Sequence, residues 1–236
     1  MSADSSIRDN VLRVRERIEA AASRAQRSVA EIELIGVSKT HPAEAIREAF
    51  NAGLLHFGEN RVQEWEGKLP ALQDLPGTWH LVGHLQSNKA GRAAKAFHCV
   101  DSVDDWPLAQ RLDRAQADKK SGEKLRVLVE VHLGSEESKS GMNEAGVPQL
   151  AEQLLTCEHL HFAGLMCIPP FFENPDDARP FFTQLRKCKE SLESWLGIVL
   201  PVLSMGMSHD FEAAIREGST EIRVGTAIFG TRNKPE

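Results

Sequence analysis

The 236-residue chain has no tyrosine, few cysteines and no long apolar run. Its four cysteines show neither C-x-x-C spacing nor a paired arrangement, which favours reduced thiols in a cytoplasmic protein. No stretch approaches the roughly 18 consecutive apolar residues of a membrane span. The acidic first residues also differ from the basic start of a secretory signal peptide. We therefore expect a cytoplasmic protein with no membrane partner.

Positive charge is also scarce. Lysine and arginine number 28 against 34 aspartates and glutamates, so the formal net charge is −6. Proteins that hold nucleic acids through their phosphates are normally basic, and we expect no nucleic-acid partner. The hydrophobic content of 41% and the charged content of 26% are typical of a globular protein. A chain of this length can bury about 70% of its surface and needs no disulfide or metal to form a core.

Short apolar runs alternate along the chain with longer amphipathic stretches, which predicts parallel strands joined by helices. Successive runs begin 18 to 38 residues apart, the length of a strand–helix unit. A further helix is expected before the first run, over residues 6–27. The eight runs are 32–37, 54–57, 79–82, 97–100, 126–131, 161–167, 199–203 and 221–224.

This pattern predicts an α/β fold, a single (β/α)8 TIM barrel with an extra N-terminal helix. No change of composition marks a linker, so one domain is expected over residues 1–236. An open doubly wound sheet has the same local pattern and is the alternative, although the glycine-rich fingerprint typical of that fold is absent.

Lys39 directly follows the first apolar run. Because side chains alternate along a strand, Ile35, Val37 and Lys39 share one face. If that face points inward, the amine lies over the barrel mouth, where the chemistry of such barrels is found. Desolvation there would favour the neutral amine, a nucleophile toward an aldehyde. A solvated loop lysine is the alternative.

Two glycine-containing segments follow the seventh and eighth runs and predict an anion site. The segment Ser-Met-Gly-Met-Ser at 204–208 leads from a strand into a helix, with Ser208 as the expected N-cap. Gly225 and Thr226 offer backbone and hydroxyl donors, and barrels frequently hold a phosphate in this region. Both segments could equally be simple tight turns.

Arg223 lies inside the eighth run, where alternation turns it to the same face as Gly225. A desolvated arginine requires an anion or an acceptor, and an ion pair with a barrel glutamate is the structural alternative. An amine, a phosphate site and an inward arginine on one rim together fit a phosphorylated aldehyde held as a Schiff base. Pyridoxal 5′-phosphate (PLP), linked through Lys39, is the predicted cofactor. His80 and His84 flank a strand end rather than share a helix face, so we expect no metal site.

The sequence also resembles the pyridoxal-phosphate homeostasis protein family, which is itself similar to the barrel domain of alanine racemases. The similar segments occur in the family's order, at residues 35–40, 57–64, 79–89, 136–141, 164–169, 204–208 and 223–230. His132 and His209 depart from the family's usual residues at their positions. The charged segment 136–141 matches the family well, but its residues do not explain its role.

The resemblance implies an alanine racemase N-terminal domain-like fold and a set of cofactor-binding residues. Ser204, Gly225 and Thr226 would hold the phosphate, and Arg223 would face the pyridine nitrogen. The implied cofactor-binding residues are Lys39, as the Schiff-base lysine, and Asn60, Ser204, Met205, Arg223, Gly225 and Thr226.

The missing tyrosine bears on whether such a protein is an enzyme. By resemblance, a racemase needs a lysine and a tyrosine as its two bases, and a second domain from a partner subunit. An arginine beside the pyridine nitrogen also makes the ring a poor electron sink. We therefore expect a monomeric protein that carries or buffers PLP in intracellular PLP homeostasis, with PLP-dependent apoenzymes as recipients.

Two enzymatic alternatives remain open. One is a weak racemase-like PLP enzyme in which His84 or His132 replaces the missing base. The other is a Schiff-base aldolase that acts on a sugar phosphate.

Overall fold

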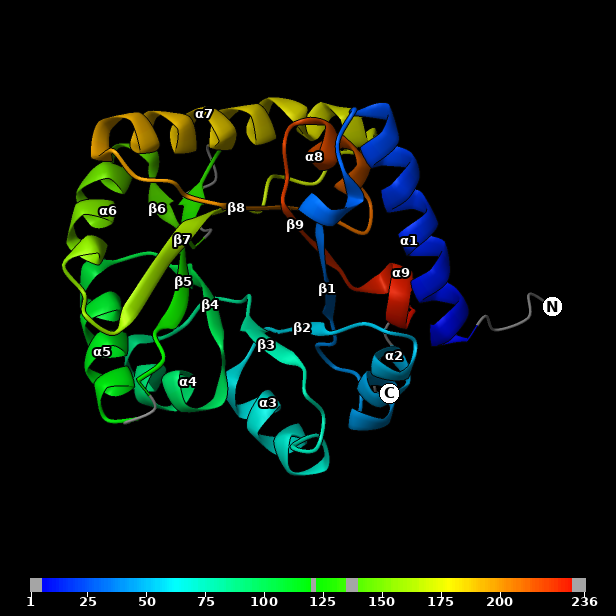
Figure 1. Cartoon of the computed structure of the whole chain (residues 1–236), viewed down its shortest axis with the longest axis horizontal. Coiled ribbons are helices and arrows are strands. Elements are labelled where there is room, and N and C mark those ends of the chain that lie inside the picture. The colour runs from blue at the N-terminus through cyan, green and yellow to red at the C-terminus, as the bar shows by residue number, and fades with distance from the viewer. Residues whose placement is uncertain (1–5, 120–121, 135–139, 231–236) are drawn as a thin grey trace.

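The computed structural model describes residues 6–119, 122–134 and 140–230. It begins with helix α1 (Ile7–Arg24), whose N-terminus is capped by Ser6. One face of α1 is buried, and the helix lies outside the barrel against α2, α8 and α9 (Figure 1). The predicted N-terminal helix is therefore confirmed, although it ends three residues earlier than expected.

Eight parallel strands form a closed barrel, as the sequence predicts (Figure 1). Each strand pairs with two neighbours: β1 pairs with β9, and β4 pairs with β5. The open-sheet alternative is thereby excluded. The short β6 (Met142–Asn143) adds to the end of β5 outside the barrel. The barrel strands are β1 (Glu33–Val37), β2 (His56–Glu59), β3 (Thr78–Leu81), β4 (Cys99–Val103), β5 (Leu125–His132), β7 (Leu160–Met166), β8 (Val202–Met207) and β9 (Glu221–Val224).

Helices surround the barrel and cover its outer face (Figure 1). They are α2 (Ala43–Asn51), α3 (Val62–Lys68), α4 (Ala90–Ala96), α5 (Trp106–Ala117), α6 (Val147–Leu155), α7 (Arg179–Leu196), α8 (Phe211–Arg216) and α9 (Thr226–Phe229). The main hydrophobic core lies between these helices and the strands. Its members include Val127, Val129 and Val131, which alternate along β5.

Two local sequence predictions are wrong. The seventh barrel strand begins at Val202, not at Val199, whose side chain is 81% exposed. The intervening Pro201 has no N–H to donate to a strand ladder. Helix α8 begins after Asp210 rather than Ser208, and Asp210 Oδ1 accepts the N–H of Met207 at 2.6 Å.

The base of the barrel holds a cluster of buried charged side chains. Arg126 Nη1 lies 2.5 Å from Glu221 Oε1, and His80 Nδ1 lies 3.0 Å from Asp101 Oδ2. Burial is the largest single influence and opposes a charged His80, but the interactions with Asp101 and Cys99 together outweigh it and raise the pKa of His80 well above its ordinary value. His80, Asp101 and Glu221 bring potential metal ligands within 4.8 Å of one another. Arg126 already supplies positive charge among them, and the absence of a metal site remains a prediction.

Candidate functional site

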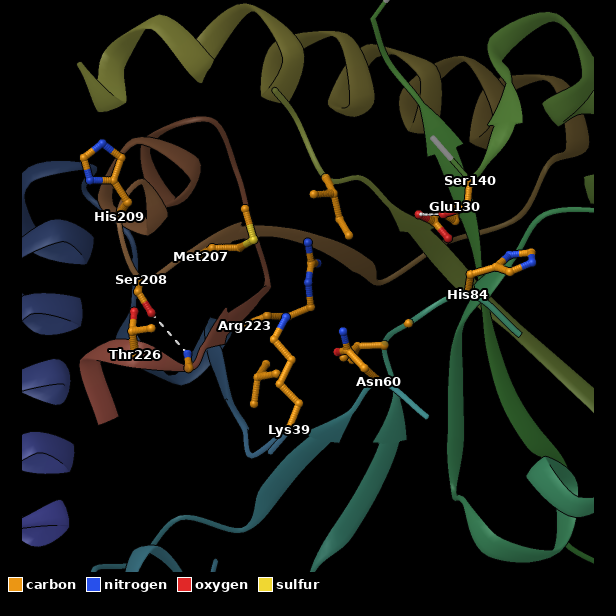
Figure 2. Close-up of a pocket in the computed structure, with 15 residues that line it drawn as sticks. Lys39, Asn60, His84, Glu130, Ser140, Met207, Ser208, His209, Arg223 and Thr226 are labelled. Atoms are coloured by element: carbon orange, nitrogen blue, oxygen red, sulfur yellow. Dashed lines mark hydrogen bonds between the residues drawn. The ribbon is translucent and has the colours of Figure 1, made fainter. Parts of the chain in front are cut away.

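A cavity of about 430 Å³ opens at the carboxyl ends of the barrel strands. This size falls in the usual range for small-molecule sites, roughly 300–1,000 Å³. Figure 2 shows the lining side chains converging from strands that are far apart in the sequence. The lining residues are Val37, Lys39, Asn60, Val82, Gly83, His84, Glu130, Ser140, Ile168, Met207, Ser208, His209, Arg223, Gly225 and Thr226.

Lys39 extends into the cavity from the end of β1, near Arg223 and Asn60 (Figure 2). Its place follows from the alternation that turns Val37 to the same cavity. The next residue, Thr40, has a left-handed backbone, with φ of 66°. The chain therefore turns sharply just after the lysine and leaves its side chain over the barrel mouth.

A buried ion pair holds this turn from below. Lys68 Nζ donates to the carbonyl oxygen of Ser38 at 3.0 Å and to carboxylate oxygens of Glu59 and Glu64, both at 2.8 Å. Ser38 Oγ also donates to Glu59 Oε1 at 2.7 Å. Burial raises the pKa of Glu59, although Lys68 opposes the shift. The sequence analysis missed this support, because it joins three separate segments.

Hydroxyl and backbone donors gather at one end of the cavity, formed by Ser208, Gly225 and Thr226 (Figure 2). Ser208 Oγ accepts the N–H groups of Gly225 at 3.1 Å and of Ala227 at 3.4 Å. Ser208 is therefore not the helix cap that the sequence predicts, but it joins the two segments expected to bind an anion. We call these three residues the donor end.

Arg223 is buried on the inner face of β9 and lines the cavity. Its Nη1 donates to Ser204 Oγ at 2.6 Å, and its Nη2 donates to the carbonyl oxygen of Cys167 at 2.7 Å. The acceptors of this guanidinium are thus a hydroxyl and a carbonyl group rather than the glutamate of the structural alternative. They fix its plane beneath the cavity.

Most of the sequence-predicted residues meet in this cavity. Lys39, Asn60, Arg223, Gly225 and Thr226 all line it. Two predicted residues on β8 do not. Ser204 is fully buried and reaches the site through Arg223. Met205 points to the other face of β8, where its side chain packs in the hydrophobic core.

Opposite the donor end lie side chains that the sequence analysis did not assign to cofactor binding. Glu130 is 4% exposed and accepts a hydrogen bond from Ser140 Oγ at 3.1 Å. Burial raises the pKa of this carboxyl group. Alternation along β5 could have found Glu130, because Arg126 and Glu130 lie on the face opposite to that of Val127, Val129 and Val131.

The residues proposed to replace a racemase base lie at different places. His84 lines the cavity, with its Nδ1 3.2 Å from Asp104 Oδ2. His132 ends β5 and is not one of the lining residues. Of the charged segment 136–141, residues 136–139 lie outside the described part of the chain, whereas Ser140 lines the cavity. His209 lies at the rim, and its Nε2 is 3.1 Å from the carbonyl oxygen of Phe172.

The fold and the site together define the class of protein. Residues 8–233 match the family model described as alanine racemase, N-terminal domain, and the chain belongs to that family. An alanine racemase of Clostridium difficile shares the fold, with a TM-score of 0.70 at 16% identity over 96% of this chain and 57% of the racemase.

Curated relatives place the chain more narrowly, in the pyridoxal phosphate homeostasis protein family. The relative from Aquifex aeolicus is 43% identical over 95% of this chain and 97% of its own length. The relative from Pseudomonas aeruginosa is 44% identical over 97% of both chains. PipY of Synechococcus elongatus, solved with PLP bound, matches with a TM-score of 0.80 and 42% identity over 91% of this chain and 100% of PipY.

Proposed function

We propose that this protein binds PLP as a Schiff base on Lys39 and carries or buffers it for intracellular PLP homeostasis. The observation that carries the proposal is one cavity lined by Lys39, the donor end and the buried Arg223. Lys39 suits an aldehyde, the donor end suits a phosphate, and Arg223 suits a ring nitrogen. The relatives' names and the PLP-bound structure of PipY support the same cofactor.

The chain's own residues divide the binding between them. In our proposal Lys39 supplies the amine that joins the aldehyde carbon, and the donor end holds the phosphate. Gly225 suits this role because a Cβ there would lie 3.3 Å from the carbonyl oxygen of Val37, which leaves little room for a side chain. Asn60, which directly follows β2 and lines the cavity, would contact the cofactor. Met205 can contribute only backbone atoms, because its side chain lies in the core.

Arg223 decides what the bound cofactor can do. A guanidinium carries donors and no acceptor, so facing the pyridine nitrogen it leaves that nitrogen unprotonated. PLP supplies an electron sink when its ring is protonated, and Arg223 weakens that property. Ser204 acts as a positioning residue, since it holds Nη1 of Arg223. These features favour a carrier over an enzyme.

A weak racemase-like activity is the second candidate function. The observation in its favour is that His84 lines the cavity, although Figure 2 shows it beside Glu130 rather than beside Lys39. Solvent-derived deuterium at the α-carbon of L-alanine, incubated with the PLP-loaded protein, measures this activity. Exchange above that of free PLP would support the enzyme.

The remaining expectations are proposals of the same kind. We propose a cytoplasmic monomer with a single domain over residues 1–236, which delivers PLP to PLP-dependent apoenzymes. Across the part of the chain that the structure describes, no helix combines the length and the apolar character needed to span a membrane.

Absorbance spectroscopy tests the proposal directly. Incubation with PLP should give a visible band, and borohydride followed by peptide mapping should fix the label on Lys39. The Lys39→Ala variant should lose the band but retain noncovalent binding through the donor end. Lys187→Ala, which changes an exposed lysine on α7, is the matched control and should keep the band. A label on another lysine would refute the assignment.

A further inference from the structure

The cavity wall across from the donor end is acidic. We call it the acidic wall and define it by the lining residues Glu130 on β5, Ser140 and His84; Asp104, which follows β4, lies behind the wall and pairs with His84. Figure 2 shows Glu130, Ser140 and His84 grouped on one side of the cavity, with Ser208 and Thr226 on the other. The cavity lining is therefore polarised, with donors at one end and the carboxyl group of Glu130 at the other.

Glu130 is the central group of this wall. It is 96% buried, as its exposed fraction of 4% implies, and Ser140 satisfies only Oε1. Among the described residues, Oε2 has no hydrogen-bond partner, although Glu130 lines the cavity. A buried carboxyl oxygen without a donor is costly, so this atom is suited to receive one from a bound molecule.

The charged groups around Glu130 come from several elements. Burial raises the pKa of Glu130, a hydrogen bond from Ser140 lowers it, and the charge of Asp104 raises it again. Arg223 on β9 and His84 after β3 lower it. A cation bound at the wall would act in the same direction as Arg223 and His84, and would favour the ionised carboxylate.

A carboxylate that entered the same space would find that a ring nitrogen of each lining histidine already has a partner. His84 Nδ1 lies 3.2 Å from Asp104 Oδ2, so this ring nitrogen is already engaged. His209 Nε2 faces the carbonyl oxygens of Phe172 and Glu173 at 3.1 and 3.2 Å. Under the proposed function, Arg223 faces the cofactor ring. An incoming carboxylate would instead meet Glu130, which repels it when ionised.

We propose that the acidic wall selects which molecule can take PLP from Lys39. The wall admits a small primary amine in its ammonium form, and it excludes α-amino acids because it repels their carboxylate group. The inference rests on the proposed function. In the exchange, the incoming nitrogen forms a bond to the aldehyde-derived carbon and the bond from that carbon to Lys39 Nζ breaks. The incoming nitrogen passes from an ammonium ion to a protonated imine and so loses two protons, and Lys39 Nζ gains two protons as it leaves as an ammonium group. Neither oxidant nor reductant is needed.

Such selectivity would suit a carrier. Free amino acids would not strip PLP from Lys39, whereas an amine lacking a carboxylate would. Among the described residues of the wall, the charged or titratable lining groups are Glu130 and His84, and a buried carboxylate requires a cation or several donors, so the wall suits an ammonium ion better than the carboxylate of an amino acid.

The test compares 2-aminoethanol with glycine, two primary amines that differ mainly in the carboxylate. PLP-loaded protein is mixed with each at equal concentration and ionic strength near pH 8, and the loss of the protein-bound visible band is timed. Each rate is divided by the rate of the same amine with free PLP. We expect wild type to favour 2-aminoethanol about tenfold or more, and Glu130→Gln to lose most of this preference by reacting faster with glycine.

Two controls separate the possible failures. Glu152→Gln changes an exposed glutamate on α6 and should behave as wild type. Loading of Lys39 is verified first by borohydride labelling, and thermal unfolding verifies that each variant is folded. Absence of loading contradicts the proposed function. The inference about the wall is overturned if PLP loads normally and the ratio of the rates with 2-aminoethanol and glycine is the same for wild type, Glu130→Gln and free PLP.

A second measurement uses PLP-free protein. With inorganic phosphate present to fill the donor end, ligand-observed NMR should detect binding of 2-aminoethanol to wild type. The signal should fall at least several-fold in Glu130→Gln and be unchanged in Glu152→Gln. Equal signals for wild type and Glu130→Gln would contradict the role of Glu130.

Discussion

Replacing Lys68 with alanine tests whether the turn that carries Lys39 depends on the buried ion pair beneath it. The side chain of Glu59 is 1% exposed and that of Lys68 is 11% exposed, and their charged atoms are 2.8 Å apart. Removal of one member of a buried pair costs about 3–5 kcal/mol, because the other charge stays buried without its partner. Lys68 also donates to Glu64 and to the Ser38 carbonyl group, so we expect a loss of roughly 3 kcal/mol or more in the free energy of unfolding.

The sign of the pH dependence follows from Glu59. Its folded-state pKa is raised by burial, and Lys68 opposes this rise, so Lys68→Ala raises the pKa further. A carboxyl group with a raised folded-state pKa destabilises the fold most when the pH is high enough to ionise it. The deficit of Lys68→Ala should therefore be larger at pH 8 than at pH 5, because the lower pH favours the protonated, neutral form of Glu59.

Urea denaturation of wild type and variants at both pH values measures this deficit. Lys189→Ala is the matched control, because Lys189 also pairs with a glutamate four residues along its helix but at a more exposed site. Its cost should stay near or below about 1 kcal/mol. The double variant Glu59→Gln, Lys68→Met should recover part of the loss, because no charge remains buried alone. A deficit below about 1 kcal/mol for Lys68→Ala, or one independent of pH, would refute the reasoning.

Three further predictions concern the site and the barrel. Ser204→Ala removes the hydroxyl group that holds Arg223. The visible band of the PLP-loaded protein should therefore shift and the affinity for PLP should fall several-fold, while Lys39 still reacts with PLP. An unchanged spectrum and affinity would contradict the positioning role of Ser204. Gly206→Ala should cost about 1–3 kcal/mol in denaturant unfolding, because φ is +95° and the new Cβ would lie 2.6 Å from Ala214 Cβ; a neutral effect would be inconsistent with this geometry. Burial raises the pKa of Glu221 to about 7, so wild type should lose stability as the pH rises through about 7, and Glu221→Gln should flatten the profile of Tm between pH 5 and 8.

Local patterns were sufficient to predict the strands and several site residues. The apolar runs matched all eight barrel strands, and alternation within β1 and β9 turned Lys39 and Arg223 to the inside. Both results depend on neighbouring residues only. Val199 shows where such reasoning fails, because an apolar residue at a run's edge is indistinguishable by type from one in the strand.

Contacts between distant segments could not be predicted in this way. Ser208 has the residue type and position of a helix cap, but its hydroxyl group accepts backbone N–H groups from Gly225 and Ala227. The N-cap position is taken by Asp210 instead, whose side chain makes no capping hydrogen bond. Met205 was included with its neighbours in a motif, yet strand alternation directs its side chain into the core. The sequence motif predicted that segment 204–208 lies at the site, whereas the packing of the barrel decided which of its side chains face the cavity.

By itself, the sequence determined the succession of strands and helices, the inward face of each strand and the donors that follow the last two strands. These properties arise from backbone geometry and from the apolar or polar character of adjacent residues. Only the tertiary structure decided which strand ends face one another. Closure through the β4–β5 and β1–β9 pairs sets Glu130 across the mouth from Ser208 and Thr226. That polarity is a property of the closed barrel, since no short segment contains both ends of it.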